Sequence, residues 1–440
     1  MEGYDRLACG MVYAATMEED EMRSLLPLRV AAASMVACCL VAAGCAGPSK
    51  LAAPVTITAG APTAVSYWNE VATATINMPA SAAGTPAERL ADYATDLATV
   101  QIAVYDAVIA IAGAYRPYAV TPSLDTAGAS QEAAAAAAAH GVLRGLFPSR
   151  SARYQAAYDS FLGTLPDAAA RAKGVAIGAE VAARILVLRA DDGRSTALPP
   201  FAAGTQPGQF RDPRPANRLA TYVRPFVITS NAQFRAPGPP PLDSAHYAAD
   251  LNETRTLGGS TSAVRTAEQL QIARFNTEPP PTFWPRNLRR FAMTDRSIAE
   301  HARLMAMLWV AHADATYACF ESKYHYMFWR PFSAIAGMEP AWTPVVPTPN
   351  NPEYPAAHGC AAGAAVAVLR SYYGTDKVAF DFDSTVTGTT RHFDNLDALL
   401  DEITIARIAG GMHFRRSILD GEALGVGVGN WVVTHAFAPK

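Results

Sequence analysis

Residues 323–331 read KYHYMFWRP, residues 355–359 read PAAHG, and residues 407–413 read RIAGGMH. Besides His325, which helical geometry would turn to a different face, these segments carry three cations and two histidines in a fixed order: Lys323, Arg330, His358, Arg407 and His413. A single Lys or Arg is usually a solvated surface residue, and a single His is more often a satisfied polar group than a catalyst. The order and spacing of the three segments together predict one buried site for an oxyanion.

The composition favours helices and excludes several classes of partner. Half of the 440 residues are apolar, which is enough to bury a large core. Alanine dominates and alternating β-branched residues are scarce, so we expect an all-α protein. The formal net charge of -3 gives no broad basic field for nucleic acid or anionic lipid. A cationic site in this chain must therefore be local.

Residues 1–45 have the layout of a secretory leader, with residues 1–21 as an upstream extension. Basic residues precede an apolar run over residues 30–43, and small residues precede Cys45. The Gly-Cys junction resembles a bacterial lipoprotein cleavage box, so a lipid anchor at Cys45 is one expectation. An uncleaved membrane anchor is the alternative, but the run is shorter than the roughly 20 residues that span a bilayer. We expect export to the periplasm or cell surface, a polar tether over residues 46–63, and no spanning segment after the leader.

Helical patterns begin near Ala64 and recur through residues 90–111, 132–146 and 167–189. The second of these regions contains an uninterrupted alanine run, Ala133 to Ala139. Alanine has the highest helix propensity and a small side chain, so we interpret this run as a helix packed closely against a neighbour. The N-terminal half is therefore predicted to be helical.

Residues 198–242 are rich in proline, which excludes long helices there. A loop of this length is usually a lid, a rim or a wrap between helical layers, although an interdomain linker is equally compatible with the sequence. Helices are expected to resume near Ser244, Thr266 and Met293. A second proline-rich stretch, residues 340–355, separates the Lys323 segment from the His358 segment.

Gly421, Gly425 and Gly429 recur at intervals of four residues near the C-terminus. They invite a phosphate-loop interpretation, but no Gly-Lys-Ser/Thr follows and no strand is indicated before them. A glycine stripe that allows close helix packing is the stronger interpretation.

Beyond the leader only Cys319 and Cys360 remain. Export would permit a disulfide between them, but two cysteines do not make a framework, and buried free thiols are an equally good prediction.

The three cations point to a specific chemistry if they converge. Lys323 and Arg330 are two helical turns apart, so on a helix they would project from nearly one face, with Pro331 marking a helix end or kink. Three buried cations repel one another unless an anion compensates them. A tetrahedral oxyanion fits, because guanidinium groups match its oxygens and an ammonium adds a point charge. The two histidines would then serve as a nucleophile or ligand and as a general acid-base.

The series Lys-x6-Arg-Pro, Pro-x-x-His and Arg-x5-His resembles the signature of the superfamily of vanadium haloperoxidases and type 2 phosphatidic acid phosphatases. The sequence around the motifs, including residues 352–355 and 410–415, is more similar to the soluble bacterial haloperoxidases than to the membrane-spanning lipid phosphatases. The resemblance implies a bundle of long helices, here a single domain over residues 64–440 with its catalytic motifs in residues 301–435.

The resemblance also implies roles for the motif residues. Lys323, Arg330 and Arg407 would bind the oxygens of vanadate or phosphate, and the backbone at Ala357 would approach the same anion. His413 would be the vanadium ligand in a peroxidase or the phosphorus nucleophile in a phosphatase. His358 would be the acid-base group. Vanadate is the implied cofactor of a peroxidase, and a phosphatase needs none.

Two of the motifs depart from the family pattern. Ala356 and Ala357 stand where the family commonly has Ser-Gly, so a hydroxyl bond to the oxyanion is absent. Ser417 stands where an Asp usually follows the second histidine by four residues. We expect Asp420, less than one turn further on, to orient His413 instead; a solvated or helix-capping carboxylate is the alternative.

Three functions follow as hypotheses. The first is an exported haloperoxidase that uses vanadate and hydrogen peroxide to oxidise a halide to hypohalous acid, with an organic molecule as the acceptor. The second is a phosphomonoesterase that forms a phosphohistidine at His413. The third is a non-catalytic lipoprotein that binds an oxyanion. None involves nucleic acid, and the membrane enters only through the lipid anchor at Cys45.

Overall fold

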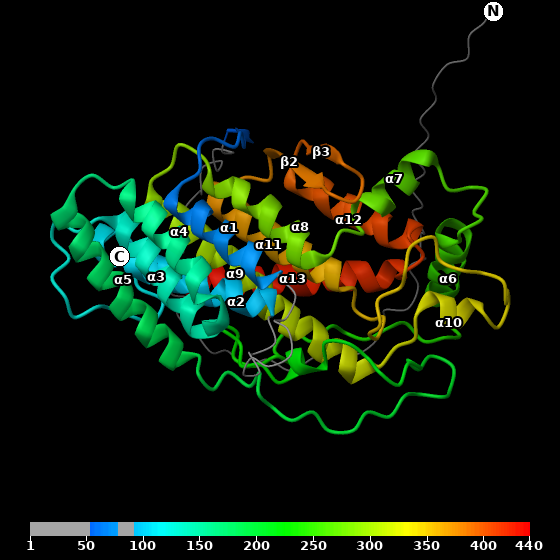
Figure 1. Ribbon diagram of the computed structural model, residues 1–440. Coiled ribbons are helices and arrows are strands. Elements are labelled where there is room, and N and C mark those ends of the chain that lie inside the picture. Colours follow the sequence, from blue (N-terminus) through cyan, green and yellow to red (C-terminus); the bar gives the residue numbers. More distant parts are fainter. Residues whose placement is uncertain (1–52, 78–91) are drawn as a thin grey trace, which may run out of the picture. The chain divides into compact units, whose positions relative to one another are not determined.

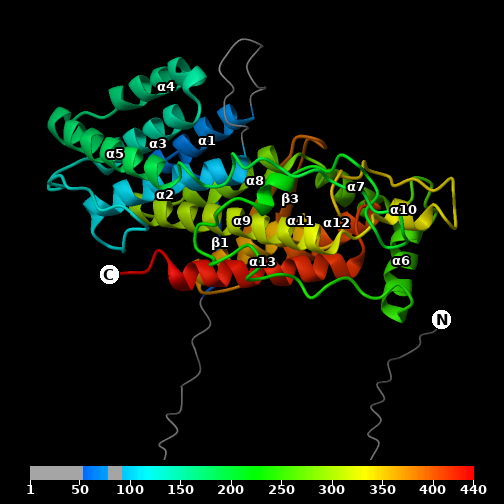
Figure 2. The same ribbon diagram turned by 90° about the horizontal axis from the view of Figure 1, so that it is seen from below.

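Long α-helices account for most of the chain after Thr63. The computed structural model describes residues 53–77 and 92–440, which belong to one compact unit, Leu51–Lys440. The predicted leader lies outside the described residues. The helices and strands, seen in Figures 1 and 2, are β1 (Val55–Thr56), α1 (Ala64–Ile76), α2 (Tyr93–Ala112), α3 (Gln131–Leu146), α4 (Ser151–Gly163), α5 (Ala168–Leu188), α6 (Ala245–Gly258), α7 (Ala267–Phe275), α8 (Pro280–Leu288), α9 (Ile298–Tyr326), α10 (Pro331–Ile335), α11 (Ala357–Tyr373), β2 (Val378–Ser384), β3 (Thr389–Phe393), α12 (Leu396–Ala409) and α13 (Arg415–His435). The prediction of an all-α fold class is confirmed.

The N-terminal helices begin where the sequence supplies a cap. The side chains of Asp92, Ser130 and Asp167 accept hydrogen bonds from first-turn amides of α2, α3 and α5. The alanine run Ala133–Ala139 is buried along its whole length, and α3 packs against α5. The interpretation of the run as a packing surface is therefore confirmed.

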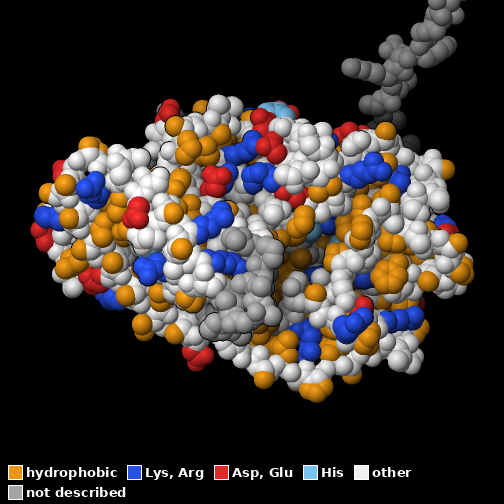
Figure 3. All heavy atoms as spheres, viewed as in Figure 1, with side chains coloured by type: hydrophobic (Ala, Val, Ile, Leu, Met, Phe, Trp, Pro, Cys, Tyr) orange, Lys and Arg blue, Asp and Glu red, His pale blue; other side chains and the backbone are white. Residues whose placement is uncertain are grey.

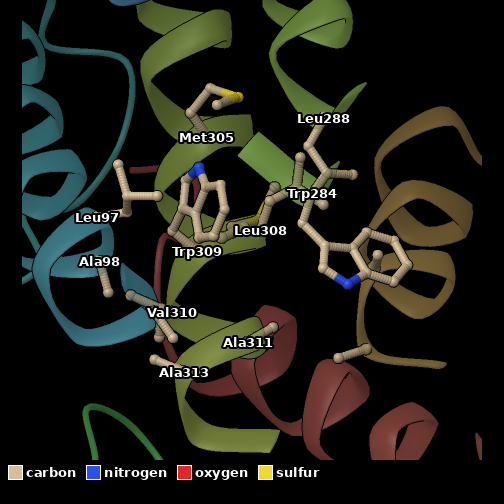
Figure 4. Packing of buried hydrophobic residues seen from close by; sticks show 14 of the residues in the cluster. Leu97, Ala98, Trp284, Leu288, Met305, Leu308, Trp309, Val310, Ala311 and Ala313 are labelled. Carbon is tan, nitrogen blue, oxygen red and sulfur yellow. The ribbon is translucent and has the colours of Figure 1, made fainter. Parts of the chain in front are cut away.

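Helix α9 lies at the centre of the core and packs against α2, α11 and α13. Figure 4 shows Trp309 of α9 facing Leu97 of α2, while Trp284 of α8 lies on the other side of α9. All three side chains are buried. Because α9 also ends at the predicted site, this packing fixes the place of Lys323.

One helix in the described part of the chain, α2, is long and apolar enough to cross a membrane, contrary to our expectation for the region after the leader. Its most apolar window is 89% buried inside the protein. A core helix meets the same criteria of length and composition, and α2 is one.

Helices α11 and α13 approach each other closely through glycine. A Cβ atom on Gly425 would lie 2.1 Å from the carbonyl oxygen of Cys360, and one on Gly421 would lie 2.6 Å from that of Ala356. Gly429 likewise faces α11. The interpretation of these glycines as a helix-packing stripe is confirmed. The contact matters for the site because α11 carries His358 and α13 begins just after His413.

A small sheet accompanies the helices and was not predicted. Its order is β1-β2-β3, with β1 parallel to β2 (Val55 opposite Val378) and β2 antiparallel to β3 (Phe380 opposite Phe393). Its strands are short, so the sheet makes up only a small part of the secondary structure in the described residues. Because β1 lies within the predicted tether, the last part of that tether belongs to the folded unit.

Helices α4 and α8 were also not predicted. Only Tyr154 of α4 is buried, so this helix has little apolar periodicity to detect. Helix α8 begins with two prolines, which a first helical turn tolerates because its amides lack intrahelical acceptors.

Replacing Gly425 by Ala should destabilise the protein by about 3 kcal/mol, because the new methyl group must push the α11 backbone away. Gly427→Ala on the same helix is the matched control. Its Cβ would meet only the Phe234 side chain, at 3.0 Å, and the helix gains intrinsic propensity, so its stability should change by less than about 1 kcal/mol. Urea denaturation followed by circular dichroism measures both. Equal effects would contradict the close contact at Gly425.

Candidate active site

The five predicted cationic and histidine residues converge from separate elements. Lys323 lies in the last turn of α9, Arg330 caps α10, His358 lies in the first turn of α11, and Arg407 lies in the last turn of α12. His413 lies in the connection from α12 to α13. The Arg330 guanidinium reaches His413 and the Arg407 guanidinium reaches His358. Figure 3 shows a recess in one face of the molecule with basic, histidine and hydrophobic side chains inside it.

Lys323 is fully buried, and its ammonium donates to the carbonyl oxygens of Pro352 (2.7 Å) and Glu353 (3.0 Å). Burial, followed by the charge of Arg330, lowers the pKa of Lys323 to about 8. The predicted two-turn helical spacing to Arg330 is wrong, because α9 ends at Tyr326 and Met327 adopts a left-handed conformation (φ 52°). The two cations are brought together by a turn, and Pro331 begins a new helix rather than kinking the old one.

Arg330 is 2% exposed and uses its guanidinium to join three segments. Its Nε donates to the carbonyl oxygen of Asn351 (2.8 Å) and its Nη2 to Oδ1 of the same residue (2.9 Å). Its Nη1 donates to the carbonyl oxygen of Met412 (3.0 Å) and to Nε2 of His413 (2.9 Å). Burial lowers the pKa of Arg330, yet a guanidinium remains charged at neutral pH.

Arg407 is equally buried but has fewer partners. Its Nη2 donates to the carbonyl oxygen of Asn276 (2.6 Å), and its Nη1 lies 3.3 Å from each ring nitrogen of His358. Among the described residues its Nε has no hydrogen-bond partner. A buried donor without an acceptor is costly, and an anion would satisfy it. This orphaned N–H is an observation in favour of an oxyanion beside Arg407.

His358 is half-buried in the first turn of α11, one residue after Ala357. Ala356, at the N-cap, supplies no side-chain acceptor to the first-turn amides, so these amides remain available to an anion. Burial, followed by the charge of Arg407, holds the pKa of His358 well below its ordinary value. The ring is therefore neutral at pH 7 and able to accept a proton.

His413 is 3% exposed and held through both ring nitrogens. The turn before it contains Gly411 at φ 76°, where a Cβ would lie 2.5 Å from the carbonyl oxygen of Gly258. The Nδ1 atom lies 2.9 Å from Oε1 of Glu353, while Nε2 accepts from Arg330. Since Nε2 accepts, the proton of the neutral ring belongs on Nδ1. Burial, followed by the charge of Arg330, holds the pKa of His413 well below its ordinary value.

Glu353 is a site residue that the sequence analysis missed. It is fully buried, and its Oε1 also accepts from the backbone amide of Phe414 (3.0 Å). Burial raises the pKa of Glu353 to about 7, against the opposing influence of Arg330. The only signal for it in the sequence is the Pro-Glu-Tyr-Pro stretch at residues 352–355, which contributes to the family resemblance but has no spacing that assigns a role to Glu353.

The prediction that Asp420 orients His413 is wrong. Its carboxylate accepts from the hydroxyl of Tyr354 (2.6 Å) and from Nε of Arg416 (3.0 Å), so it holds the start of α13 against the loop. Asp420 is seven residues beyond His413, so helical geometry places it further along α13 and away from the ring. The His413 ring faces residues 351–353 instead.

The proline-rich segment 198–242 wraps the site from outside. The amide of Phe210 donates to Met327, the amide of Trp329 to Gly208, and the amide of Gly238 to the Tyr354 hydroxyl. These bonds hold the loops that carry Arg330 and Glu353. Of the alternatives that the sequence left open, the structure supports a wrap and not a linker.

The remaining polar candidates have local partners. His301 and His312 contact Thr294 and Tyr93, as expected for packing histidines. Cys319 and Cys360 are buried free thiols.

Three comparisons with known proteins find similarity to haloperoxidases. Residues 303–439 match the family model of the VCPO second helical-bundle domain. Vanadium chloroperoxidase from Curvularia inaequalis is 28% identical over a match that covers 31% of this chain and 33% of that protein. The chain thus spans about a third of the length of this curated relative.

Solved structures extend the likeness to most of the chain. A bacterial vanadium-dependent iodoperoxidase has a TM-score of 0.70 at 25% identity, with 86% of this chain and 99% of that chain covered. A holo-type bacterial vanadium-dependent chloroperoxidase shares the fold with a TM-score of 0.59 at 16% identity, covering 85% and 96%. By family model, curated relative and fold, the chain is thus similar to vanadium-dependent haloperoxidases.

Proposed function

We propose that this protein is an exported vanadium-dependent haloperoxidase that oxidises halide with hydrogen peroxide. The observation that carries the proposal is the neutral His413 ring, whose unprotonated Nε2 contacts buried Arg330, with buried Lys323 and Arg407 close by. The similarity to iodoperoxidase and chloroperoxidase structures supports the peroxidase reaction. Export rests on the leader in residues 1–45, which lie outside the described residues.

The residues present fit a tetrahedral oxyanion. Lys323, Arg330 and Arg407 would hold its oxygens, and the free Nε–H of Arg407 would gain an acceptor. The first-turn amides of α11, starting at Ala357, would add the positive end of a helix dipole. Nε2 of His413 would be the protein ligand, because it is the unprotonated ring nitrogen; Nη1 of Arg330, which now donates to it, would donate to the anion instead.

His358 would move the protons. Its ring is neutral, half-buried and next to Arg407, so it can take a proton from peroxide and return it as water leaves. Vanadate, when bound, would supply a Lewis acid that polarises the peroxide without changing its own oxidation state.

A phosphomonoesterase is the second candidate. The observation that favours it is the hydrogen bond from Nδ1 of His413 to Glu353, which leaves Nε2 unprotonated, as an attacking nucleophile requires. In that reaction vanadate would inhibit, because it resembles the pentacoordinate transition state of phosphoryl transfer.

The leaderless protein should brominate a phenolic reporter with bromide and peroxide only when orthovanadate is added. His413→Ala should reduce this activity to background. His358→Ala should reduce it by about 10²- to 10⁴-fold, the usual contribution of a general acid-base. The measurement is the rate of bromination, with hydrolysis of a generic phosphomonoester followed in parallel.

His392→Ala is the control, because this exposed histidine pairs with Asp381 on the small sheet. Its rate should equal that of the unmodified protein. Bromination that persists in His413→Ala would disprove the assignment, and hydrolysis inhibited by vanadate would establish the phosphatase. If both assays were silent while vanadate still bound, the protein would be an oxyanion binder.

The affinity for an oxyanion should fall as pH rises through about 8, the pKa of Lys323. Below this pH the lysine is protonated and attracts the anion. Above it, each pH unit should weaken binding by about tenfold, as expected for one linked proton. Calorimetry with tungstate, a tetrahedral dianion that does not titrate in this range, measures the effect directly.

Lys323→Arg should remove this pH dependence, because arginine stays charged. The same slope in that variant would show that another group is responsible.

A further inference from the structure

Glu353 makes more contacts with the histidine segment than any predicted site residue does except Arg330. Its Oε1 accepts from Nδ1 of His413 (2.9 Å) and from the next backbone amide, that of Phe414 (3.0 Å). One carboxylate oxygen therefore fixes both the ring and the backbone beside it.

The main chain of Glu353 is fixed as firmly as its side chain. Its amide donates to the carbonyl oxygen of Phe328 (2.9 Å), and its own carbonyl oxygen accepts from Lys323 (3.0 Å). The carboxylate is thus anchored to the segments that carry the oxyanion-binding cations, and its place relative to them is set by the fold.

The position that should carry an orienting carboxylate holds Ser417 instead. Its hydroxyl donates to the carbonyl oxygen of Glu353 (3.4 Å). Asp420, the other candidate, is engaged by Tyr354 and Arg416. Among the described residues, Glu353 is the acidic side chain that contacts the His413 ring.

We propose that Glu353 is the positioning residue of His413. It takes the place of the carboxylate that the family pattern has at the position of Ser417. It holds the proton of the ring on Nδ1 and turns Nε2 towards Lys323, Arg330 and Arg407. The role that we assign to Nε2 rests on the proposed function. The contact between Glu353 and His413 does not depend on it. Carboxylates that orient a ligating histidine typically change metal affinity by about 10- to 100-fold when they are removed.

Two neutral replacements separate positioning from charge. Glu353→Gln and Glu353→Leu both remove the negative charge, but only glutamine retains an oxygen that can accept from Nδ1. A purely electrostatic role would make both variants alike. A positioning role predicts that the leucine variant binds orthovanadate about 10- to 100-fold more weakly than the glutamine variant.

The tautomer of His413 gives a readout that does not depend on activity. Nitrogen-15 NMR of histidine-labelled, ligand-free protein distinguishes protonated from unprotonated ring nitrogens, and His413→Gln assigns the signal. The proton should be on Nδ1 in the unmodified protein and in Glu353→Gln. In Glu353→Leu the signal should show a mixture of tautomers or the Nε2-protonated form.

Asp420→Asn is the matched control, and it should leave the tautomer and the affinity unchanged. The proposal would be overturned if Glu353→Leu kept a pure Nδ1–H ring and bound orthovanadate within twofold of Glu353→Gln, or if Asp420→Asn moved the tautomer. If Glu353→Leu does not fold, as judged by circular dichroism, Glu353→Ala, which also lacks the acceptor oxygen, replaces it: a mixed or Nε2-protonated ring in that variant supports the assignment, and a pure Nδ1–H ring rejects it.

The proposed function fails separately. An unmodified protein that bound no orthovanadate would contradict the haloperoxidase assignment, while the tautomer in the ligand-free protein would still decide the role of Glu353.

Discussion

The burial of Lys323, Arg330 and Arg407 around one pocket is the constraint on which the rest of the site depends. Charges in an apolar interior are tolerated only when they are hydrogen-bonded and compensated. Here carbonyl oxygens of Asn351, Pro352, Glu353 and Met412 take up several of the N–H groups, and one buried carboxylate compensates part of the charge. The residual positive charge and the free Nε–H of Arg407 leave the pocket suited to an anion.

The loop 351–353 therefore has to be held as firmly as any helix. The glycine stripe of α13 brings His413 and the first turn of α11 close together, and the wrap at residues 208–241 fixes the loop from outside. Loops that carry functional groups are usually mobile, so this bracing is what makes a loop carboxylate able to orient a buried ring.

The sequence was informative where chemistry and spacing coincide in short motifs. It located Lys323, Arg330, His358, Arg407 and His413, and the helical class followed from alanine content. It was wrong about Asp420 and about a continuous helix from Lys323 to Arg330, because both inferences extended helical geometry across a turn. Glu353 could not be found by spacing, since its contact with His413 joins residues 60 positions apart through tertiary packing. The small sheet was missed because its strands are short and separated in sequence.

Ala356 is one position at which the site departs from the family pattern while it keeps the cations and histidines of the motifs. Its side chain is fully buried, and its amide donates to the carbonyl oxygen of Ser417, so the N-cap position faces α13 and not solvent. No other side-chain donor replaces the missing hydroxyl at that position. Arg407 and the α11 amides would therefore supply more of the hydrogen bonds to an oxyanion. The same start of α13 that receives the Ala356 amide carries Ser417 where a carboxylate is expected. The two departures thus meet across one helix contact, in which the carbonyl oxygen of Ser417 accepts from the Ala356 amide and its hydroxyl donates to the carbonyl oxygen of Glu353.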